Sequence, residues 1–327
     1  MGRTAQQSAP SNRAILGTCC IPWTTDYQLD EPLFRRSIQL DIENGTKHLY
    51  LFGTAGEGHA VSDRQFQHIT RIFVDEMKTS GGDVPMVGLI SLSLSQVIDR
   101  IEWGLGVGVR HYQLSLPSWG TCTEAEAFTF FERVCTRFPQ CEFLHYNVRR
   151  SGRLLSAAEY GRLANAFLNL VAAKLAGATG EEALAIHKAA PRLKLFLTEK
   201  TFAEARALGV PAGFLISYAS LNWQLAHRYY DAVVAGDTDA IATMRAEQDG
   251  VIKILRETVA GTAHMDGAFD LMFVKRHLSE FPLRLLPPYA GVSDEVYGRF
   301  IEGVRQQYPH WLQSVPAVAA TTAGTRS

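Results

Sequence analysis

The chain has 327 residues, of which 46% are hydrophobic and 20% are charged, a composition typical of a soluble globular protein. Its formal net charge is -1, so neither nucleic acid nor an anionic membrane is predicted as a partner. The five cysteines are odd in number and lack a CxxC spacing, which argues against a disulfide framework or a zinc site. With no long apolar run and no apolar leader, we expect a cytoplasmic protein.

Short apolar runs alternate with helical patterns from the start of the chain to about residue 222. The first strand, 15–23, precedes a helix over 31–44 that Gly45 stops, and the second, 48–52, precedes a helix that a capping box of Ser62 and Gln65 begins. Six more strands are predicted at 84–90, 111–116, 142–148, 170–176, 193–197 and 213–218, with helices at 94–103, 124–138, 157–167, 181–190 and 202–208. The strand–helix unit therefore repeats eight times.

This repetition predicts the fold class. Near-continuous apolar strands indicate burial on both faces, as in parallel sheets, and alternating strands and helices predict right-handed βαβ units. Eight units within residues 13–222 suit a TIM (β/α)8 barrel, which has about 250 residues. A doubly wound open sheet is the alternative, but it usually has fewer strands. We therefore predict an α/β barrel.

The rest of the chain has no clear strand. Helical patterns at 225–235, 239–258, 269–277 and 294–308 predict a C-terminal helical extension over 223–312, packed on the barrel and available for oligomer contacts. Residues 1–12 and 313–327 are small, polar or alanine-rich and are predicted to be disordered tails.

Active sites of TIM barrels lie at the C-terminal ends of the strands. Lys174 stands in the apolar sixth strand, where an ammonium group costs several kcal/mol unless it is paired or loses its proton. A neutral amine can attack a ketone and form a Schiff base. The alternative is an edge-strand lysine whose charge reaches water along its methylene groups. On the strand alone, the edge-strand lysine is the favoured interpretation.

Three motifs at these strand ends carry a resemblance. Gly-Thr-Ala-Gly-Glu follows the second strand at 53–57, Tyr146-Asn147 ends the fifth, and Lys174 comes 28 positions after Tyr146. In this order they resemble the dihydrodipicolinate synthase/N-acetylneuraminate lyase family of class I Schiff-base aldolases. The resemblance implies a lyase that needs no cofactor or metal and forms a homo-oligomer, either a dimer or a tetramer.

The resemblance also implies roles for individual residues. Lys174 would form the Schiff base with pyruvate or a related 2-oxo acid. Tyr146 would act as general acid and base, moving protons to the carbinolamine and to the departing or arriving carbonyl, and Thr54 would orient Tyr146. Backbone N–H groups of the turn at Gly53 to Ala55 would hold the substrate carboxylate. The end of the eighth strand, Ile216 and Ser217, would complete the substrate site.

Three departures from the family bear on the second substrate. Ala55 replaces a hydroxyl residue that contacts the carboxylate. Trp119 stands where synthases have a proton-relaying tyrosine, and we expect it to form a flat apolar wall for a bulkier acceptor, since indole N–H only donates. Arg150 either meets an incoming carboxylate or belongs to a solvated loop. The predicted reaction is aldol cleavage or condensation with an aldehyde or sugar acid as second substrate. The alternatives are a Schiff-base dehydratase of a deoxy-oxo sugar acid and a catalytically silent barrel that binds a 2-oxo acid.

Several other residues are given structural roles. Glu57 is predicted to support its loop, and Lys200, in a polar segment, to be an ordinary protonated amine. His145 should face away from the neighbouring Tyr146, because side chains alternate along a strand. The glycine-rich segment 104–108 precedes a strand instead of following one, which excludes a nucleotide loop.

Overall fold

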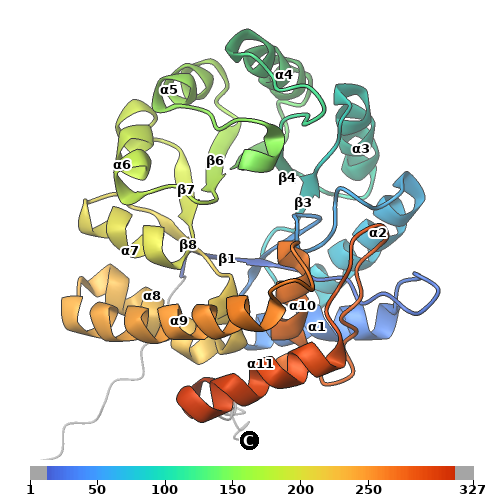
Figure 1. The fold of residues 1–327 in the computed structure, drawn as a ribbon. Helices are drawn as coiled ribbons and strands as arrows, with labels where there is room; N and C mark the ends of the chain where they lie inside the picture. The colour runs from blue at the N-terminus through green and yellow to red at the C-terminus, as the bar shows by residue number, and fades with distance from the viewer. Residues whose placement is uncertain (1–12, 314–327) are drawn as a thin grey trace, which may run out of the picture.

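The computed structural model describes residues 13–313, in which eight parallel strands close into a barrel in sequence order (Figure 1). The strands are β1 (Ile15–Thr18), β2 (His48–Leu51), β3 (Met86–Leu89), β4 (His111–Leu114), β5 (Glu142–Asn147), β6 (Leu170–Leu175), β7 (Lys194–Leu197) and β8 (Gly213–Leu215). The TIM barrel prediction is confirmed. Apart from residue 313, the predicted tails lie outside the described residues.

Helices follow the strands around the barrel and continue after it. They are α1 (Glu31–Glu43), α2 (Asp63–Thr79), α3 (Leu94–Gly106), α4 (Glu124–Arg137), α5 (Ala157–Ala166), α6 (Gly180–Ala189), α7 (Glu199–Ala207), α8 (Trp223–Ala235), α9 (Thr238–Val259), α10 (Asp266–His277) and α11 (Asp294–Gln307). Three short 3-10 helices are η1 (Arg149–Ser151), η2 (Tyr218–Leu221) and η3 (Pro309–Leu312). No helix within residues 13–313 is both long and apolar enough to cross a membrane.

Local sequence signals begin several ring helices. Capping boxes start four of them, with N-caps at Ser62, Thr123, Ser156 and Thr179. In each box the hydroxyl accepts from a backbone N–H, and a Glu or Gln three residues later returns to the backbone of the cap. The predicted capping box of Ser62 and Gln65 is therefore confirmed.

The strands are shorter than their apolar runs. β3 begins at Met86, two residues after the predicted start, because Val84 is 51% exposed and lies beyond the barrel. β8 ends at Leu215, because the chain leaves the barrel there and turns into η2. The apolar runs in the sequence therefore extend beyond the residues that pair in β3 and β8.

Two large apolar cores pack outside the barrel wall. The larger fills the space between the strands and the ring helices, and α8 joins it when Tyr229 packs on Phe214 of β8. The smaller joins α9, α10 and α11 and includes Ala55 of the loop after β2. The division predicted at residue 222 stays a prediction, but the second core fixes α10 (orange in Figure 1) beside the barrel mouth.

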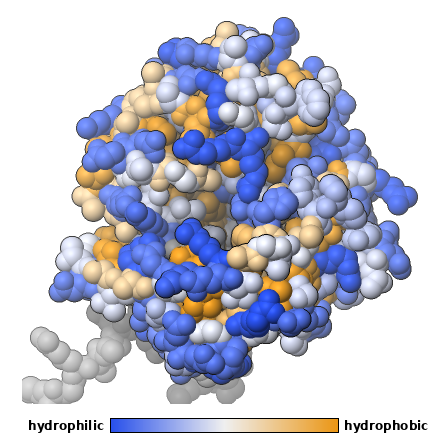
Figure 2. Space-filling model, in the orientation of Figure 1, coloured by the Kyte–Doolittle hydropathy of each residue, from blue (hydrophilic) through white to orange (hydrophobic). Residues whose placement is uncertain are grey.

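The contact between α10 and the loop after β2 is close. A Cβ atom on Gly267 of α10 would lie 3.2 Å from the carbonyl oxygen of Thr54 and 3.5 Å from Cα of Ala55. Glycine at this position lets the start of α10 approach the backbone of the loop. Figure 2 shows the surface hollowed near the centre of this face, with hydrophilic and hydrophobic side chains both present around the hollow.

Candidate active site

Lys174 lies inside the barrel, on β6, in register with Tyr146 of β5. Its side chain is only 4% exposed, and Nζ donates a hydrogen bond to Oη of Tyr50, on β2, at 2.7 Å. Nζ also lies 4.3 Å from the ring centroid of Tyr50 and 4.0 Å from that of Tyr146. The amine is therefore held between two phenol rings, and it does not extend to the surface as an edge-strand lysine would.

Burial changes the protonation of this amine. Loss of water lowers the pKa of Lys174 to about 7, although Asp270 and Asp266 on α10 oppose the change. At neutral pH about half of the molecules would carry a neutral amine, whereas a surface lysine with a pKa of about 10.4 is neutral in about one molecule in 2,500. Its burial and lowered pKa therefore make Lys174 a candidate nucleophile.

Tyr146 is the second ionisable group of the pocket. Burial raises its pKa, and interaction with the Thr54 hydroxyl works in the opposite direction. Thr54 is buried in the loop after β2, so its hydroxyl meets the phenol from a neighbouring part of the barrel mouth. The phenol therefore keeps its proton at neutral pH and can offer it to a bound carbonyl oxygen.

The loop after β2 is built around Tyr50 and Glu57. A Cβ atom on Gly53 would lie 2.3 Å from Cε2 of Tyr50, so glycine is required to accommodate the ring that contacts Lys174. The Glu57 carboxylate accepts hydrogen bonds from Nε1 of Trp23 at 2.5 Å and from N of Leu286 at 2.6 Å. Burial raises the pKa of Glu57 to about 7. Glu57 therefore ties the loop to the segment that follows β1 and to the C-terminal segment, in agreement with its predicted supporting role.

Two cavities meet at the barrel mouth. The inner one, of about 120 Å³, surrounds the lysine and is lined by Thr18, Tyr50, Thr54, Ala55, Tyr146, Lys174, Ala176, Thr198, Leu215, Ile216, Ser217, Asp266 and Asp270. The outer one, of about 870 Å³, shares Thr54 and Tyr146 with it. The structure thus brings together Lys174, Tyr146, Thr54, Ala55, Ile216 and Ser217, while Gly53 shapes the inner cavity from behind Tyr50.

The prediction that Trp119 forms a wall of the pocket is wrong for the single chain. Its side chain is 90% exposed and lines neither cavity. The preceding residue, Ser118, lines the outer cavity instead. The chain turns outward after Ser118, which directs the indole to the surface.

Arg150 lines the outer cavity, but its guanidinium group is already paired. It donates to both carboxylate oxygens of Asp266, at 2.8 and 3.2 Å, and this hydrogen-bonded pairing raises the pKa of Arg150. The residue is therefore neither an unpaired cation nor part of a fully solvated loop. The ion pair of Arg150 and Asp266 joins η1 to the start of α10.

Three important groups of the inner cavity are absent from the residues predicted to form the site. Tyr50 belongs to a strand that was assigned from its apolar pattern alone. Asp266 and Asp270 lie one helical turn apart on α10, in the predicted extension. An acid within the apolar sequence Phe269-Asp270-Leu271-Met272 is a signal that could have been recognised, because such a carboxyl usually faces a cavity or a partner.

The residues that were predicted to have only structural roles lie away from the cavity around Lys174. His145 is buried on the outer side of β5, where Nδ1 and the hydroxyl of Tyr160 are 2.8 Å apart, and burial lowers its pKa to about 3. Lys200 lies on α7 with a 72% exposed side chain. Within residues 13–313 no cluster of three or more His, Cys, Asp or Glu side chains is arranged to hold a metal ion.

Comparisons with known proteins agree with this architecture. A model of the Dihydrodipicolinate synthetase family matches residues 11–296. The 4-hydroxy-tetrahydrodipicolinate synthase of Mesorhizobium japonicum is 24% identical over 232 residues, which are 69% of this chain and 77% of that protein. That of Thermus thermophilus is 23% identical over 149 residues, 45% of this chain and 49% of that protein.

Two solved structures show the same fold. YagE, a prophage protein of the dihydrodipicolinic acid synthase family from E. coli K12, in complex with pyruvate, aligns with a TM-score of 0.75 and 17% identity, over 90% of this chain and 98% of that chain. CdNal from Clostridium difficile, in complex with mannosamine, aligns with a TM-score of 0.76 and 16% identity, over 89% of this chain and 98% of that chain. At such identities the likeness concerns the fold.

Proposed function

Because the chain belongs to the dihydrodipicolinate synthetase family, we propose that it is a class I lyase whose Lys174 forms a Schiff base with pyruvate or a related 2-oxo acid. One observation carries the proposal: the amine of Lys174 is buried between Tyr50 and Tyr146, and its pKa is lowered to about 7. A neutral amine in a pocket open to a cavity is what addition to a ketone requires. Pyruvate bound to the related YagE barrel supports the choice of ligand.

The proposed chemistry follows from the Schiff base. Once formed, the iminium withdraws electrons from the carbon beside it, so that a carbon–carbon bond there can break or form. Tyr146 would give a proton to the carbonyl oxygen of the second substrate, or take one from the hydroxyl of the aldol adduct. Thr54 would hold the phenol in position. Proton transfer of this kind contributes about 10²- to 10⁴-fold to enzymatic rates.

The substrate carboxylate would be held by the loop after β2. Backbone N–H groups at Gly53 to Ala55 can approach an anion closely, because glycine and alanine add little bulk there. Ala55 lines the inner cavity but supplies no hydroxyl. Ile216 and Ser217 would bound the opposite side of the 2-oxo acid.

The second substrate would occupy the outer cavity. Its volume of about 870 Å³ accommodates an aldehyde of sugar size, and Ser91, Ser93, Ser115, Ser118 and Ser151 contribute hydroxyl-bearing side chains to its lining. The Ser115 hydroxyl is buried without a hydrogen-bond partner within the described residues, so it is available to a ligand. These features favour a hydroxylated aldehyde or sugar acid over an aromatic one, and a sugar-binding relative, CdNal with mannosamine, agrees with that choice.

The first test is to trap the Schiff base. We expect that incubation with pyruvate, reduction with borohydride and proteolysis give an N-(1-carboxyethyl) adduct on the peptide that contains Lys174. Lys174→Ala should give none, and Lys200→Ala, which removes an exposed lysine, should give the same adduct as the unaltered protein. Absence of the adduct, or its presence on another lysine, would contradict the proposal.

Product analysis then separates the reactions open to a Schiff base. With sugar-acid substrates, two products that include pyruvate indicate aldol cleavage. One product that retains every carbon atom indicates the dehydratase alternative. An adduct with no turnover of any substrate in the panel indicates a barrel that only binds a 2-oxo acid.

A further inference from the structure

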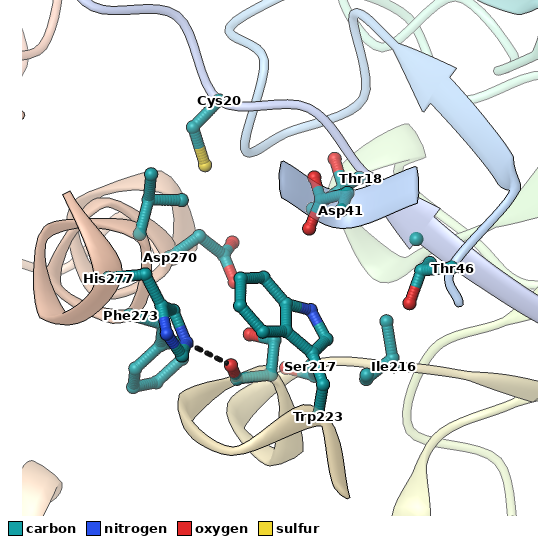
Figure 3. Close-up of a pocket in the computed structure, with 13 residues that line it drawn as sticks. Thr18, Cys20, Asp41, Thr46, Ile216, Ser217, Trp223, Asp270, Phe273 and His277 are labelled. Atoms are coloured by element: carbon teal, nitrogen blue, oxygen red, sulfur yellow. Dashed lines mark hydrogen bonds between the residues drawn. The ribbon is translucent and has the colours of Figure 1, made fainter. Parts of the chain in front are cut away.

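A small chamber lies behind the lysine cavity, between the barrel wall and the helices α1, α8 and α10 (Figure 3). Its volume is about 30 Å³, which is enough for about two water molecules at roughly 10–15 Å³ each. Asp41 of α1 and Asp270 of α10 face it from two sides. The hydroxyl of Thr46, a residue only 1% exposed, lines it without a hydrogen-bond partner within residues 13–313. One unpaired hydroxyl and two carboxyl groups that line a chamber of this size can hold water there.

The chamber and the lysine cavity share part of their lining. Thr18, Ile216, Ser217 and Asp270 line both. In Figure 3 the Asp270 carboxyl extends from α10 toward the centre of the chamber, near Ser217. Asp270 is therefore the acid that lies between the chamber and the cavity around Lys174.

The carboxyl of Asp270 is also free to react. Among the side chains that the structure describes, it forms no hydrogen bond and no ion pair, whereas Asp266, one turn earlier on α10, is held by Arg150. A carboxyl in an enclosed cavity without a protein partner is costly unless it is protonated or meets a ligand. The two acids of α10 thus differ in their availability.

We propose that Asp270 is the acid that protonates the hydroxyl group leaving the carbinolamine on Lys174, and that the chamber behind it receives the released water. The inference rests on the proposed Schiff base. The amine nitrogen first bonds to the ketone carbon, and a proton moves from nitrogen to oxygen to give the neutral carbinolamine. The carbon–oxygen bond then breaks as Asp270 gives its proton to the leaving hydroxyl. The products are an iminium cation, one water molecule and the Asp270 carboxylate, so charge and atoms balance.

The same arrangement serves the reverse step. The Asp270 carboxylate beside the iminium stabilises its positive charge and can accept a proton from the water that hydrolyses it. Tyr146 lines both the inner and the outer cavity and would serve the second substrate, although the family resemblance also implies a role for it at the carbinolamine. Two proton-transfer steps are thus assigned to two different residues.

Charged groups around Asp270 determine its protonation. Burial raises the pKa of Asp270 to about 7; Asp266 and Glu199 act in the same direction, and Lys174 opposes them. The other ionisable groups that line the two cavities with it are Asp41, Cys20 and His277 in the chamber, and Tyr50 and Tyr146 beside the lysine. At neutral pH a protonated Asp270 and a neutral Lys174 can therefore coexist.

The test is the rate of Schiff-base formation with pyruvate, measured by rapid mixing and borohydride trapping between pH 5.5 and 9. In the unaltered protein we expect a bell-shaped profile, because the amine must be neutral and the acid protonated. Asp270→Asn should form the same Lys174 adduct about 10²-fold more slowly, with the alkaline fall abolished. The pH–rate profile of Asp266→Asn should keep both its acidic and its alkaline limb, whatever the rate at its maximum.

Chemical rescue gives a second readout. Asp270→Ala leaves space for a small acid, and added formate should accelerate trapping in this variant and not in the unaltered protein. Circular dichroism and thermal melting would establish that both variants are folded. A bell-shaped profile and an unchanged rate in Asp270→Asn, or no rescue by formate, would overturn the inference. Failure of the unaltered protein to form any adduct would instead refute the proposed function.

Discussion

The reactivity of Lys174 depends on its contacts with Tyr50 and Tyr146. The phenol of Tyr50 accepts a hydrogen bond from Nζ, which favours the ammonium form, while burial favours the neutral form. Both rings face the amine with their π-electrons, which attract a cation. The pKa of about 7 reflects a balance in which the loss of water outweighs these attractions.

Removing one hydroxyl should shift this balance. Tyr50→Phe keeps the ring but loses the hydrogen bond from Lys174, so the ammonium form should be destabilised and the pKa of Lys174 should fall further. The acidic limb of the pH profile for pyruvate trapping would then move to lower pH. A shift to higher pH would show instead that the phenol favours the neutral amine.

Tyr146 should affect turnover more than Schiff-base formation. Tyr146→Phe removes the proposed proton donor and keeps the ring over Lys174. We expect turnover of an aldol substrate to fall at least about 10²-fold, while borohydride still traps pyruvate on Lys174. Equal losses in trapping and turnover would argue against a separate role for the phenol.

At the scale of elements, the loop after β2 and helix α10 form one unit. Gly53 gives room to the Tyr50 ring, Glu57 anchors the loop to Trp23 and Leu286, and Gly267 lets α10 approach Thr54. Phe52 and Glu57 have positive φ angles of 59° and 52°, a conformation that costs energy in residues other than glycine. The hydrogen bonds of Glu57 help to hold this strained segment in place.

Gly53 provides a direct test of this unit. Gly53→Ala places a Cβ atom against the Tyr50 ring, so we expect a loss of about 1–3 kcal/mol in the free energy of unfolding and slower pyruvate trapping. Urea denaturation measures the first effect. Gly120→Ala is the matched control, because a Cβ atom there meets nothing within 4 Å. Similar stability of the two variants would contradict the close packing.

The chamber predicts a dependence of stability on pH. Burial raises the pKa of Asp41 to about 8, with the Trp223 indole opposing it, whereas an unfolded aspartate has a pKa of about 3.9. The folded protein therefore holds this proton more tightly, and its stability should fall as pH rises from about 4 to 8, by at most about 1.4 kcal/mol per pH unit. Asp41→Asn should flatten the dependence. Asp26→Asn, in an exposed loop, should leave it as it was, and equal slopes for both variants would exclude Asp41 as the cause.

At the scale of the whole molecule, the barrel could be predicted because its signals are local and repeated. Apolar runs recur in each unit, capping boxes begin four of the ring helices, and Lys174 and Tyr146 fall on adjacent strands by order alone. The position of α10 could not be predicted in the same way. Its docking depends on apolar contacts with residues far earlier in the chain, such as Ala55, and no pattern within α10 specifies them. Asp266 and Asp270 were therefore missed, and Trp119 was placed by resemblance at a position from which the chain turns away.

Assembly is a property of the whole molecule that remains to be measured. A homo-oligomer, dimer or tetramer, is predicted from the family resemblance. Sedimentation velocity should then give a mass two or four times the 36.2 kDa of the chain. A single species at the mass of one chain over the concentrations used for activity would contradict this prediction.

The origin of the two acids in the mouth has an evolutionary consequence. The proposed nucleophile, Lys174, is carried by a strand of the barrel, whereas Asp266 and Asp270 are carried by a helix that follows the eight repeated units. Mutations at two codons of that helix can therefore alter the acidity of the pocket without disturbing the strand that holds the lysine. The lysine and its chemical surroundings can thus diverge separately within one lineage.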